Sequence, residues 1–249
     1  MDPSLLQCAV DLLAPAESVA VLTGAGISAE SGIPTFRGPD GFWKGFRPEE
    51  VATPEAFARD PKLVWDFYNY RRRLLGQVQP NAAHYALARL EAALPEFTLI
   101  TQNVDGLHRL AGSRNVLEVH GNLWRVRCTG CGAVFDKPRV SLPELPACER
   151  CGKLLRPDVV WFGEMLSEAV WAEAMAATGA CDCFMVIGTS ALVHPAAGLV
   201  WTARQHGARV LEVNLEATPA SEVADVSLYG KAREILPDLV ARAIEQRHG

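Results

Sequence analysis

Short apolar runs alternate with longer segments of helical periodicity along most of the chain. Buried β-strands are predicted for six short runs of mainly apolar residues, at 19–22, 97–102, 116–120, 183–187, 209–214 and 225–228. Helices are predicted where apolar residues recur at helical spacing, at 3–13, 82–93, 195–206 and 232–246. Strands separated by helices predict an α/β fold with a parallel sheet and helices on both faces.

Two segments interrupt this alternation. The first runs from Pro48 to Gly76 and is rich in aromatic residues and arginines. Its prolines at 54 and 61 fit helix starts, and we predict two short helices there. The second, from Arg125 to Arg156, contains four cysteines in two close pairs. Both segments are therefore expected to be insertions into the sheet-forming part of the chain.

The four cysteines predict a metal site. They stand as Cys128-Thr-Gly-Cys131 and Cys148-Glu-Arg-Cys151, with 16 residues between the inner two. Each pair brings two thiolates to one ion, and two pairs complete the tetrahedron that zinc prefers. Because all four ligands are protein side chains, no position stays open for water. One structural zinc ion is expected, and four unrelated cysteines at this spacing are improbable.

Composition narrows the class of protein. The chain has 249 residues, 49% of them hydrophobic, a net charge of −5 and a pI near 5.7. This acidic balance argues against a nucleic-acid-binding or membrane-surface protein. No stretch approaches the roughly 18 to 20 apolar residues of a membrane span, and the first residues lack the features of a secretory signal. The cysteine pairs favour a reducing compartment, and we expect a cytoplasmic protein.

A glycine-containing segment follows the first predicted strand. It runs from Thr23 to Trp43 as TGAGISAESGIPTFRGPDGFW. Gly24 and Gly26 allow a tight turn and a close approach to a phosphate, and Ala29 fits the third position of a dinucleotide fingerprint. A helix starting here would direct its free N–H groups at a pyrophosphate. The signal is weak alone, and the acidic residue that a hydride-transfer dehydrogenase needs about 20 residues later is missing.

Polar residues stand where the other predicted strands end. The sequence Thr101-Gln-Asn-Val-Asp105 offers amides and a carboxylate to hydroxyls or to a carboxamide, although capping of a following helix explains it equally well. His120 ends another strand, where a structural hydrogen bond is the commoner role and proton transfer the alternative. The tripeptides at 188–190 and 214–216 follow two later strands and are individually uninformative.

Together these motifs resemble the sirtuin family of NAD-consuming protein deacylases, over about residues 19 to 239. The resemblance implies a Rossmann-like domain of residues 1–43, 77–124 and 157–249. It also implies a small domain made of a helical module, 44–76, and a zinc ribbon, 125–156. NAD is then a co-substrate held by Gly24, Ala25, Gly26, Ser28, Phe36, Arg37, Trp43, Gln102, Asn103, Asp105, Gly188, Thr189, Ser190, Asn214, Leu215, Glu216 and Ala232.

The same resemblance implies the catalytic roles. Asn103 and Asp105 match the residues that hold the nicotinamide end, and His120 matches the general base that acts on a ribose hydroxyl. The acyl oxygen attacks C1′ of the nicotinamide ribose, and the products are nicotinamide, O-acyl-ADP-ribose and free lysine. The expected partners are acylated-lysine proteins bound as extended peptides, with no nucleic acid and no membrane. The chain is expected to be a monomer or a weak oligomer.

Two further segments match the family's substrate-binding residues. An extended peptide is expected to pair with one stretch on each side, involving Val160, Trp161, Phe162, Gly163 and Val193. The alternative for Val159 to Phe162 is a core strand.

Tyr68 and Arg71 are three residues apart and share a helix face. They resemble the acyl-pocket motif of the class III branch, which removes succinyl and malonyl groups. Tyrosine in the core and arginine on the surface is the alternative.

Two other classes of protein would share some of these features. A nicotinamide oxidoreductase would use the same sheet and glycines, and its turnover would change the absorbance of NADH. A zinc-ribbon binding module would predict nucleic-acid affinity with a steep dependence on salt. Neither class explains the segment from Thr23 to Trp43 together with the polar strand ends.

Overall fold

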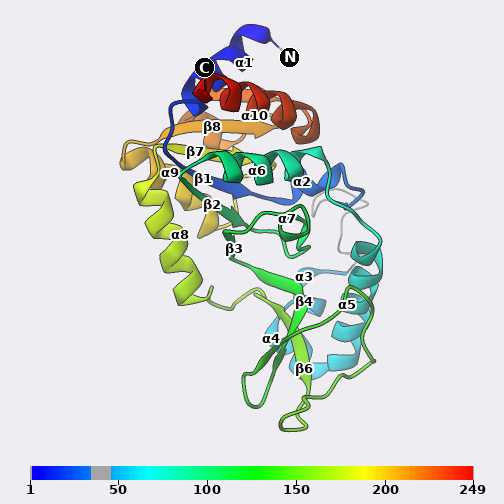
Figure 1. Ribbon diagram of the computed structural model, residues 1–249. Helices are drawn as coiled ribbons and strands as arrows, with labels where there is room; N and C mark the ends of the chain where they lie inside the picture. The colour runs from blue at the N-terminus through cyan, green and yellow to red at the C-terminus, as the bar shows by residue number, and fades with distance from the viewer. Residues whose placement is uncertain (1, 35–45, 249) are drawn as a thin grey trace.

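A six-stranded parallel sheet forms the centre of the larger part of the molecule (Figure 1). The computed structural model describes residues 2–34 and 46–248. The strands lie in the order β3-β2-β1-β7-β8-β9. Their bounds are β1 Ser18–Thr23, β2 Glu96–Thr101, β3 Val116–Glu118, β7 Cys183–Ile187, β8 Arg209–Asn214 and β9 Val226–Tyr229.

The strand order reverses its direction next to β1, between β1 and β7. This is the order of dinucleotide-binding sheets, in which the ligand crevice lies at the carboxyl ends of the strands flanking that point. Every residue of β7 is buried, because helices cover both faces of a parallel sheet. The Rossmann-like fold class predicted from the sequence is confirmed.

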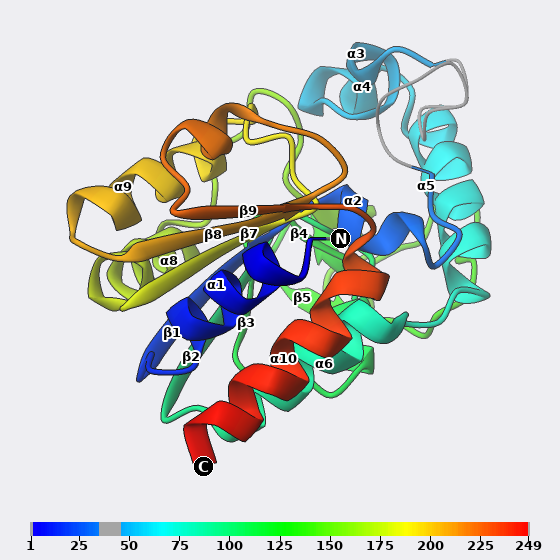
Figure 2. The ribbon, with the colours of Figure 1, turned by 90° about the horizontal axis from the view of Figure 1, so that it is seen from above.

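Helices cover the two faces of the sheet (Figure 2). One face packs against α1 (Pro3–Leu13), α6 (Ala82–Ala93) and α10 (Ala232–His248). The other packs against α8 (Glu168–Ala180) and α9 (Leu199–Gln205). Two short helices, α2 (Ala25–Ala29) and α7 (Leu107–Leu110), follow the ends of β1 and β2. None of the helices within the described residues is long and apolar enough to cross a membrane.

The two insertions fold together at one end of the molecule (Figure 1). The first forms α3 (Pro48–Val51), α4 (Pro54–Arg59) and α5 (Pro61–Gly76). The second contributes to an antiparallel sheet, ordered β5-β4-β6, of β4 (Gly121–Cys128), β5 (Val134–Asp136) and β6 (Leu155–Val159). The prediction of two helices in 48–76 is wrong, because a proline starts each of three.

The core of this small domain joins α5 to the antiparallel sheet. Trp65 is fully buried, and its indole N–H donates to the Leu155 carbonyl at 2.9 Å. Leu107, Leu123 and Trp161 pack in the same core, although they lie in segments expected to belong to the larger domain. The two parts therefore interlock, and the predicted domain boundaries stay a prediction.

Three further elements differ from expectation. Strand β3 ends at Glu118, two residues earlier than predicted, so that His120 lies in a turn. The helix expected at 195–206 begins as a 3₁₀ turn, Ala196–Gly198, before α9. Helix α8 was not predicted, because its alanine-rich sequence has no apolar stripe and buries only Ala174 and Thr178 fully. Composition, rather than periodicity, was the available signal for α8.

Candidate active site

The loops after β1 and β7 pack directly against each other at the carboxyl edge of the sheet. The Gly24 amide donates to the Ile187 carbonyl at 3.1 Å, and the Gly26 amide donates to the Gly188 carbonyl at 2.7 Å. A Cβ atom added to Gly26 would lie 2.7 Å from that same carbonyl oxygen. Gly188 has a φ of +57°, a region that favours glycine. The glycines are therefore required by the contact between loops, in addition to the phosphate approach expected from the sequence.

Thr189 connects three strand ends. Its hydroxyl accepts a hydrogen bond from the Gln102 amide at 2.9 Å, and its carbonyl accepts one from the Asn214 amide at 2.7 Å. Gln102 follows β2, Thr189 follows β7 and Asn214 ends β8. The fold thus gathers at one edge the predicted residues of separate motifs, including Ala25 and Ser190 beside these loops.

A buried polar cluster lies beside the glycine loops. The Ser28 hydroxyl donates to Asp105 Oδ2 at 2.8 Å, while the Asn103 amide donates to Ser28 Oγ at 3.2 Å and to the Gly24 carbonyl at 3.0 Å. Asp105 Oδ1 accepts the Leu107 amide at 2.9 Å and so also caps α7. One carboxylate oxygen of Asp105 therefore bonds the first residue of the following helix, as one sequence interpretation expected, and the other joins the cluster. Binding of a carboxamide by Asp105 stays a prediction.

His84 extends this cluster from behind, which the sequence did not indicate. Its Nδ1 accepts the Asn81 amide at 3.3 Å, so Nε2 carries the proton and donates to Ser28 Oγ, also at 3.3 Å. A chain of donors therefore runs from Asn81 through His84 and Ser28 to the Asp105 carboxylate. In the sequence, the Asn-x-x-His capping pattern at the start of α6 was the signal that fixes the orientation of His84.

Burial sets the charge states in this cluster. Desolvation lowers the pKa of His84 to about 4, and it lowers the pKa of the neighbouring His108 well below its ordinary value. The two rings are 4.8 Å apart. Burial also raises the pKa of Asp105, while hydrogen bonds from the Leu107 amide and the Ser28 hydroxyl oppose that rise. Both histidines are therefore neutral near pH 7.

His120 lies in the turn between β3 and β4. Its Nδ1 lies 3.1 Å from the Gln102 carbonyl, which only accepts, so Nδ1 carries the proton and Nε2 is the basic nitrogen of the neutral ring. The His120 carbonyl accepts the Val160 amide at 2.9 Å. Burial lowers the pKa of His120, and the bond to Gln102 opposes that shift. The ring is thus held in one orientation and is neutral at physiological pH.

Helix α5 contributes Arg71 to the other wall of the site, and Tyr68 packs beside it in the core. Arg71 is 5% exposed, so the alternative that places it on the surface is excluded. It lines a cavity together with Ala25, Ser28, Ile33, Pro34, Leu75, Asn103, Val104 and Asp105. Tyr68 is equally buried, and its hydroxyl accepts the Trp161 indole N–H at 2.9 Å. Tyr68 is therefore a core residue that also lies beside Arg71, whose guanidinium is 5.6 Å from its ring centroid.

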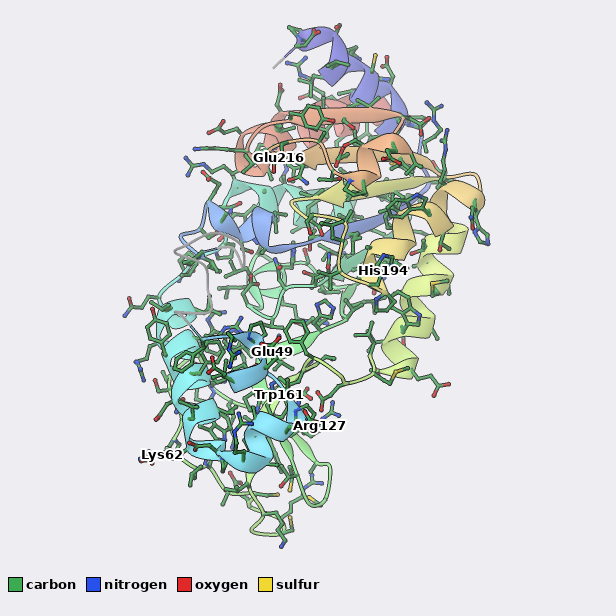
Figure 3. The ribbon with its side chains drawn as sticks, turned by 180° about the vertical axis from the view of Figure 1, so that it is seen from behind. Glu49, Lys62, Arg127, Trp161, His194 and Glu216 are labelled. Carbon is green, nitrogen blue, oxygen red and sulfur yellow. The ribbon has the colours of Figure 1, made fainter. Side chains whose placement is uncertain are left out.

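The expected peptide-binding segment leaves the sheet after β6. Trp161 is buried, whereas Phe162 is 57% exposed and Gly163 is also exposed, so a core strand through Phe162 is excluded. The Glu164 carboxylate accepts the Trp161 amide at 2.8 Å and fixes this turn. On the large-domain side, Val193 is 48% exposed. Figure 3 shows the neighbouring His194 on that side and Trp161 and Glu49 on the small domain.

The loop after β8 has a buried carboxylate beneath it. Glu212 is fully buried, and its oxygens accept hydrogen bonds from the hydroxyls of Thr218, Ser221 and Ser227 at 2.5 to 2.9 Å. Above it, Leu215 and Glu216 are exposed, and Ala232 starts α10 at the same sheet edge. Three further predicted residues, Phe36, Arg37 and Trp43, lie outside the described part of the chain.

The four cysteines of the second insertion form a metal-binding cluster. Their Sγ atoms all lie within 4.8 Å of one another, with Cys131 and Cys148 3.8 Å apart. Thiolates about 2.3 Å from a zinc ion form a tetrahedron with edges near 3.8 Å, so the cluster fits zinc. The amides of Cys131 and Gly130 lower the pKa of Cys128 to about 6, which favours its thiolate. Four protein ligands close the coordination sphere, and the zinc is structural.

Comparisons with known proteins agree with this geometry. The family model described as "Sir2 family" matches residues 24–195. The "NAD-dependent protein deacylase 2" of Pyrobaculum aerophilum is 53% identical over 232 residues, which cover 92% of each chain. A solved Sir2 homologue in complex with NAD has a TM-score of 0.90 and 49% identity over 98% of this chain and 94% of its own.

A third relative was solved with a bound peptide. The structure of Sir2Af2 bound to a myristoylated histone peptide has a TM-score of 0.80 and 36% identity, covering 99% of both chains. The fold, the cysteine cluster and the buried polar edge define a Rossmann-type protein with a structural zinc module. The chain belongs to the Sir2 family, the sirtuins. Its curated relatives with about half of their residues identical are named NAD-dependent protein deacylases.

Proposed function

We propose that this protein removes acyl groups from protein lysines, acetyl as well as succinyl and malonyl, with NAD as co-substrate. The observation that carries the proposal is the arrangement at the sheet edge. A buried Ser28–Asn103–Asp105 cluster lies beside the glycine loops, and His120, with a basic Nε2, bonds the carbonyl of Gln102, the residue before Asn103. A neutral imidazole and a preorganised polar cluster suit proton transfer and binding of a carboxamide.

The chain offers contacts for the full length of a dinucleotide. The glycine loops, with Thr189 and Ser190, would face the phosphates, and Asn103 and Asp105 would bind the carboxamide. Asn214, Leu215 and Glu216 would bind the adenosine ribose, and Ala232 would lie near the adenine. When bound, NAD would supply the ADP-ribosyl group that accepts the acyl group, and one water molecule would release the lysine, so that nicotinamide, O-acyl-ADP-ribose and free lysine are the products.

His120 carries the proton transfer in this proposal. Its Nδ1–H bond to the Gln102 carbonyl fixes the tautomer, and Nε2 then takes a proton from a ribose hydroxyl. The bond to Gln102 also stabilises the imidazolium that forms, because a carbonyl acceptor favours the charged ring. The lowered pKa keeps the ring in its basic form at neutral pH.

An acyl-lysine protein is proposed to bind as an extended segment between the two parts of the molecule. The exposed backbone of Gly163 and the exposed side chains of Phe162 and Val193 support this, since backbone pairing tolerates varied sequences. The anchoring of the turn by Glu164 keeps the segment in place. A monomer or weak oligomer in the cytoplasm, bound to neither nucleic acid nor membrane, completes the proposal. None of the seven cysteines forms a disulfide, which suits a reducing compartment.

The acyl preference is proposed to depend on Arg71 and Tyr68. A buried guanidinium in a cavity attracts a carboxylate, and succinyl and malonyl groups end in one. An acetyl group has none. Hydrogen bonds to charged groups contribute roughly 1.5 to 3 kcal/mol, or about 10- to 150-fold in rate or affinity.

Mass spectrometry of acetyl- and succinyl-peptides of one sequence, incubated with NAD, tests the function and the acyl choice together. Deacylation of either peptide with release of O-acyl-ADP-ribose supports the function, and its complete absence refutes it. Arg71→Met should lower desuccinylation at least about 10-fold more than it lowers deacetylation. Equal losses in both reactions, or no loss in either, would contradict the acyl-pocket assignment.

A further inference from the structure

Arg139, which no sequence motif singled out, reaches from the zinc-binding insertion to the cofactor side of the site. Its Nη1 donates to the Asp105 backbone carbonyl at 3.3 Å, and its Nη2 donates to the Leu75 carbonyl at 2.7 Å. One guanidinium therefore connects the insertion, the last turn of α5 and the loop after β2. Leu75 and Asp105 both line the cavity that contains Arg71.

The backbone of the insertion is held tightly at this point. A Cβ atom on Gly76 would lie 2.7 Å from the Arg139 carbonyl oxygen, so only glycine permits this approach. The Arg139 guanidinium also lies 4.5 Å from the ring centroid of Trp124, within the range of cation–π attraction. Packing and hydrogen bonds thus restrict Arg139 to one orientation.

The Asp105 carbonyl receives two donors from this region. The Trp124 indole N–H donates to it at 2.6 Å, beside the bond from Arg139. On the other side of the same residue, the carboxylate accepts Ser28 and the Leu107 amide. Fixing the carbonyl restricts the backbone rotation of Asp105, and that rotation decides where the carboxylate points.

Arg139 also acts on the charge of that carboxylate. Burial raises the pKa of Asp105, and Arg139 and Arg71 both oppose this rise by their positive charge. The titratable and charged side chains around Asp105 come from five different parts of the fold. They are Arg71 on α5, Arg139 in the zinc-binding insertion, Glu118 at the end of β3, His84 on α6 and His108 on α7. The histidines are neutral, so the two arginines are the cations that favour the ionised form of Asp105, in addition to its hydrogen bonds from the Leu107 amide and Ser28.

We propose that Arg139 is a positioning residue for NAD binding, which holds Asp105 in its binding geometry and couples the zinc module to the cofactor site. The inference rests on the proposed function, in which Asp105 binds the carboxamide end of NAD. It gives the zinc insertion a role beyond stability. The insertion supplies a cation to a site that its own metal never touches.

Two substitutions separate the geometry from the charge. Arg139→Gln removes the positive charge and the guanidinium that bonds two carbonyls at once. Arg139→Lys keeps the charge but cannot reach both the Asp105 and the Leu75 carbonyl. Lys137→Gln is the matched control. It removes one positive charge from the same insertion, but its ammonium pairs with Glu149 at 3.2 Å on the exposed side. Zinc content and melting temperature establish that each variant is folded.

The measured quantity is the dissociation constant of NAD, obtained by titration calorimetry across pH 5 to 8. Arg139→Gln should weaken NAD binding at least about 10-fold at pH 7.5, the scale of a charge-assisted hydrogen bond. NAD affinity should fall as Asp105 is protonated, and Arg139→Gln should move the midpoint of that fall to higher pH. Arg139→Lys should restore the midpoint while binding NAD more weakly than the parent. Lys137→Gln should behave as the parent.

Several results would overturn the inference. One is a parent-like dissociation constant and midpoint in Arg139→Gln, and another is the same shift in Lys137→Gln. If Arg139→Gln fails to fold, the folded Arg139→Lys variant decides, since unchanged NAD affinity there excludes a positioning role. Failure of the proposed function is distinguishable. A parent protein that binds NAD without deacylating any peptide refutes the activity and leaves the Arg139 measurement intact.

Discussion

The two halves of the active site are built on different principles. At the ends of β1 and β7 the site is made of backbone, where the Gly26 amide meets the Gly188 carbonyl and side chains are excluded. After β2 it is made of buried polar side chains, where Asn103 and Asp105 both bond to the Ser28 hydroxyl of α2. The first half should therefore be sensitive to added volume, and the second to changes of chemistry at constant volume.

The difference follows from what surrounds each half. In the backbone half, two loops approach within backbone hydrogen-bonding distance and leave no volume for a Cβ atom. The available volume therefore determines which residues are tolerated there. The side-chain half is enclosed by α6 and α7, and buried polar groups in such a place must satisfy one another. Thr23, for instance, bonds Thr101 at 2.8 Å and His108 at 3.0 Å in full burial.

The largest effect is expected from removing the proposed base of the side-chain half. His120→Ala should lower deacylation about 100- to 10,000-fold, the usual contribution of a general base. NAD affinity, measured by calorimetry, should stay within a few-fold of the parent, because the backbone half is unchanged. The control is His206→Ala, because His206 is exposed and lies before the start of β8, at the edge of the sheet opposite the site. Near-normal turnover by the His120 variant would contradict its role.

The backbone half should fail through added volume. Gly26→Ala places a methyl group 2.7 Å from the Gly188 carbonyl oxygen, and both sides of that contact are backbone. Overpacking of this kind costs about 3 kcal/mol of unfolding free energy at its upper range, and NAD binding should weaken with it.

The matched change is Gly198→Ala, whose Cβ meets no atom within 4 Å and whose φ is −64°. It should be neutral or stabilise by about 0.4 to 1 kcal/mol. Urea unfolding compares the two, and equal stability of both variants would show that the loops adjust.

Acid should lower the unfolding free energy of the protein through protonation of His84, which belongs to the side-chain half. Its pKa is about 4 in the folded protein and near 6.5 when unfolded, so the unfolded chain binds more protons between these values. The stability that it contributes is therefore complete above pH 6.5 and falls as pH falls toward 4. The loss between pH 6.5 and pH 5 is about 2 kcal/mol. His84→Gln should flatten this part of the curve of unfolding free energy against pH, and an unchanged slope would refute the assignment.

The smallest effect is expected from a change of chemistry at constant volume. Thr23→Val keeps the shape but leaves Thr101 and His108 without their partner, at a cost of about 1 to 2 kcal/mol. Thr178→Val is the control, because its equally buried hydroxyl donates only to the Ala174 carbonyl of its own helix. Denaturation of both variants should give a clear loss for the first and little for the second. Similar losses of unfolding free energy in the two variants would show that the hydrogen-bonded cluster around Thr23 contributes no more than a hydroxyl bonded within its own helix.

Much of the fold was predictable because its signals are local. Buried parallel strands are short runs of mainly apolar residues, and five of the six predicted strands lie within one residue of the observed bounds at both ends. The sixth, β3, is correct at its start and was predicted two residues too long at its end. The cysteine pairs are equally local, since two thiolates in one turn have few other uses. The alanine-rich α8 was missed because its composition rather than an apolar periodicity marks it, and the division of 48–76 into three helices was missed although a proline starts each one.

By itself the sequence determined the strands, the glycine turn, the cysteine cluster and the polar residues at strand ends, because each depends on neighbours in the chain. Only the tertiary structure decided which of them meet. Strand order brings Gly188 against Gly26, packing of α6 places His84 behind Ser28, and the insertion carries Arg139 to the Asp105 carbonyl. The physical reason is that hydrogen bonds and pKa values depend on distance and burial, and these arise between residues far apart in sequence.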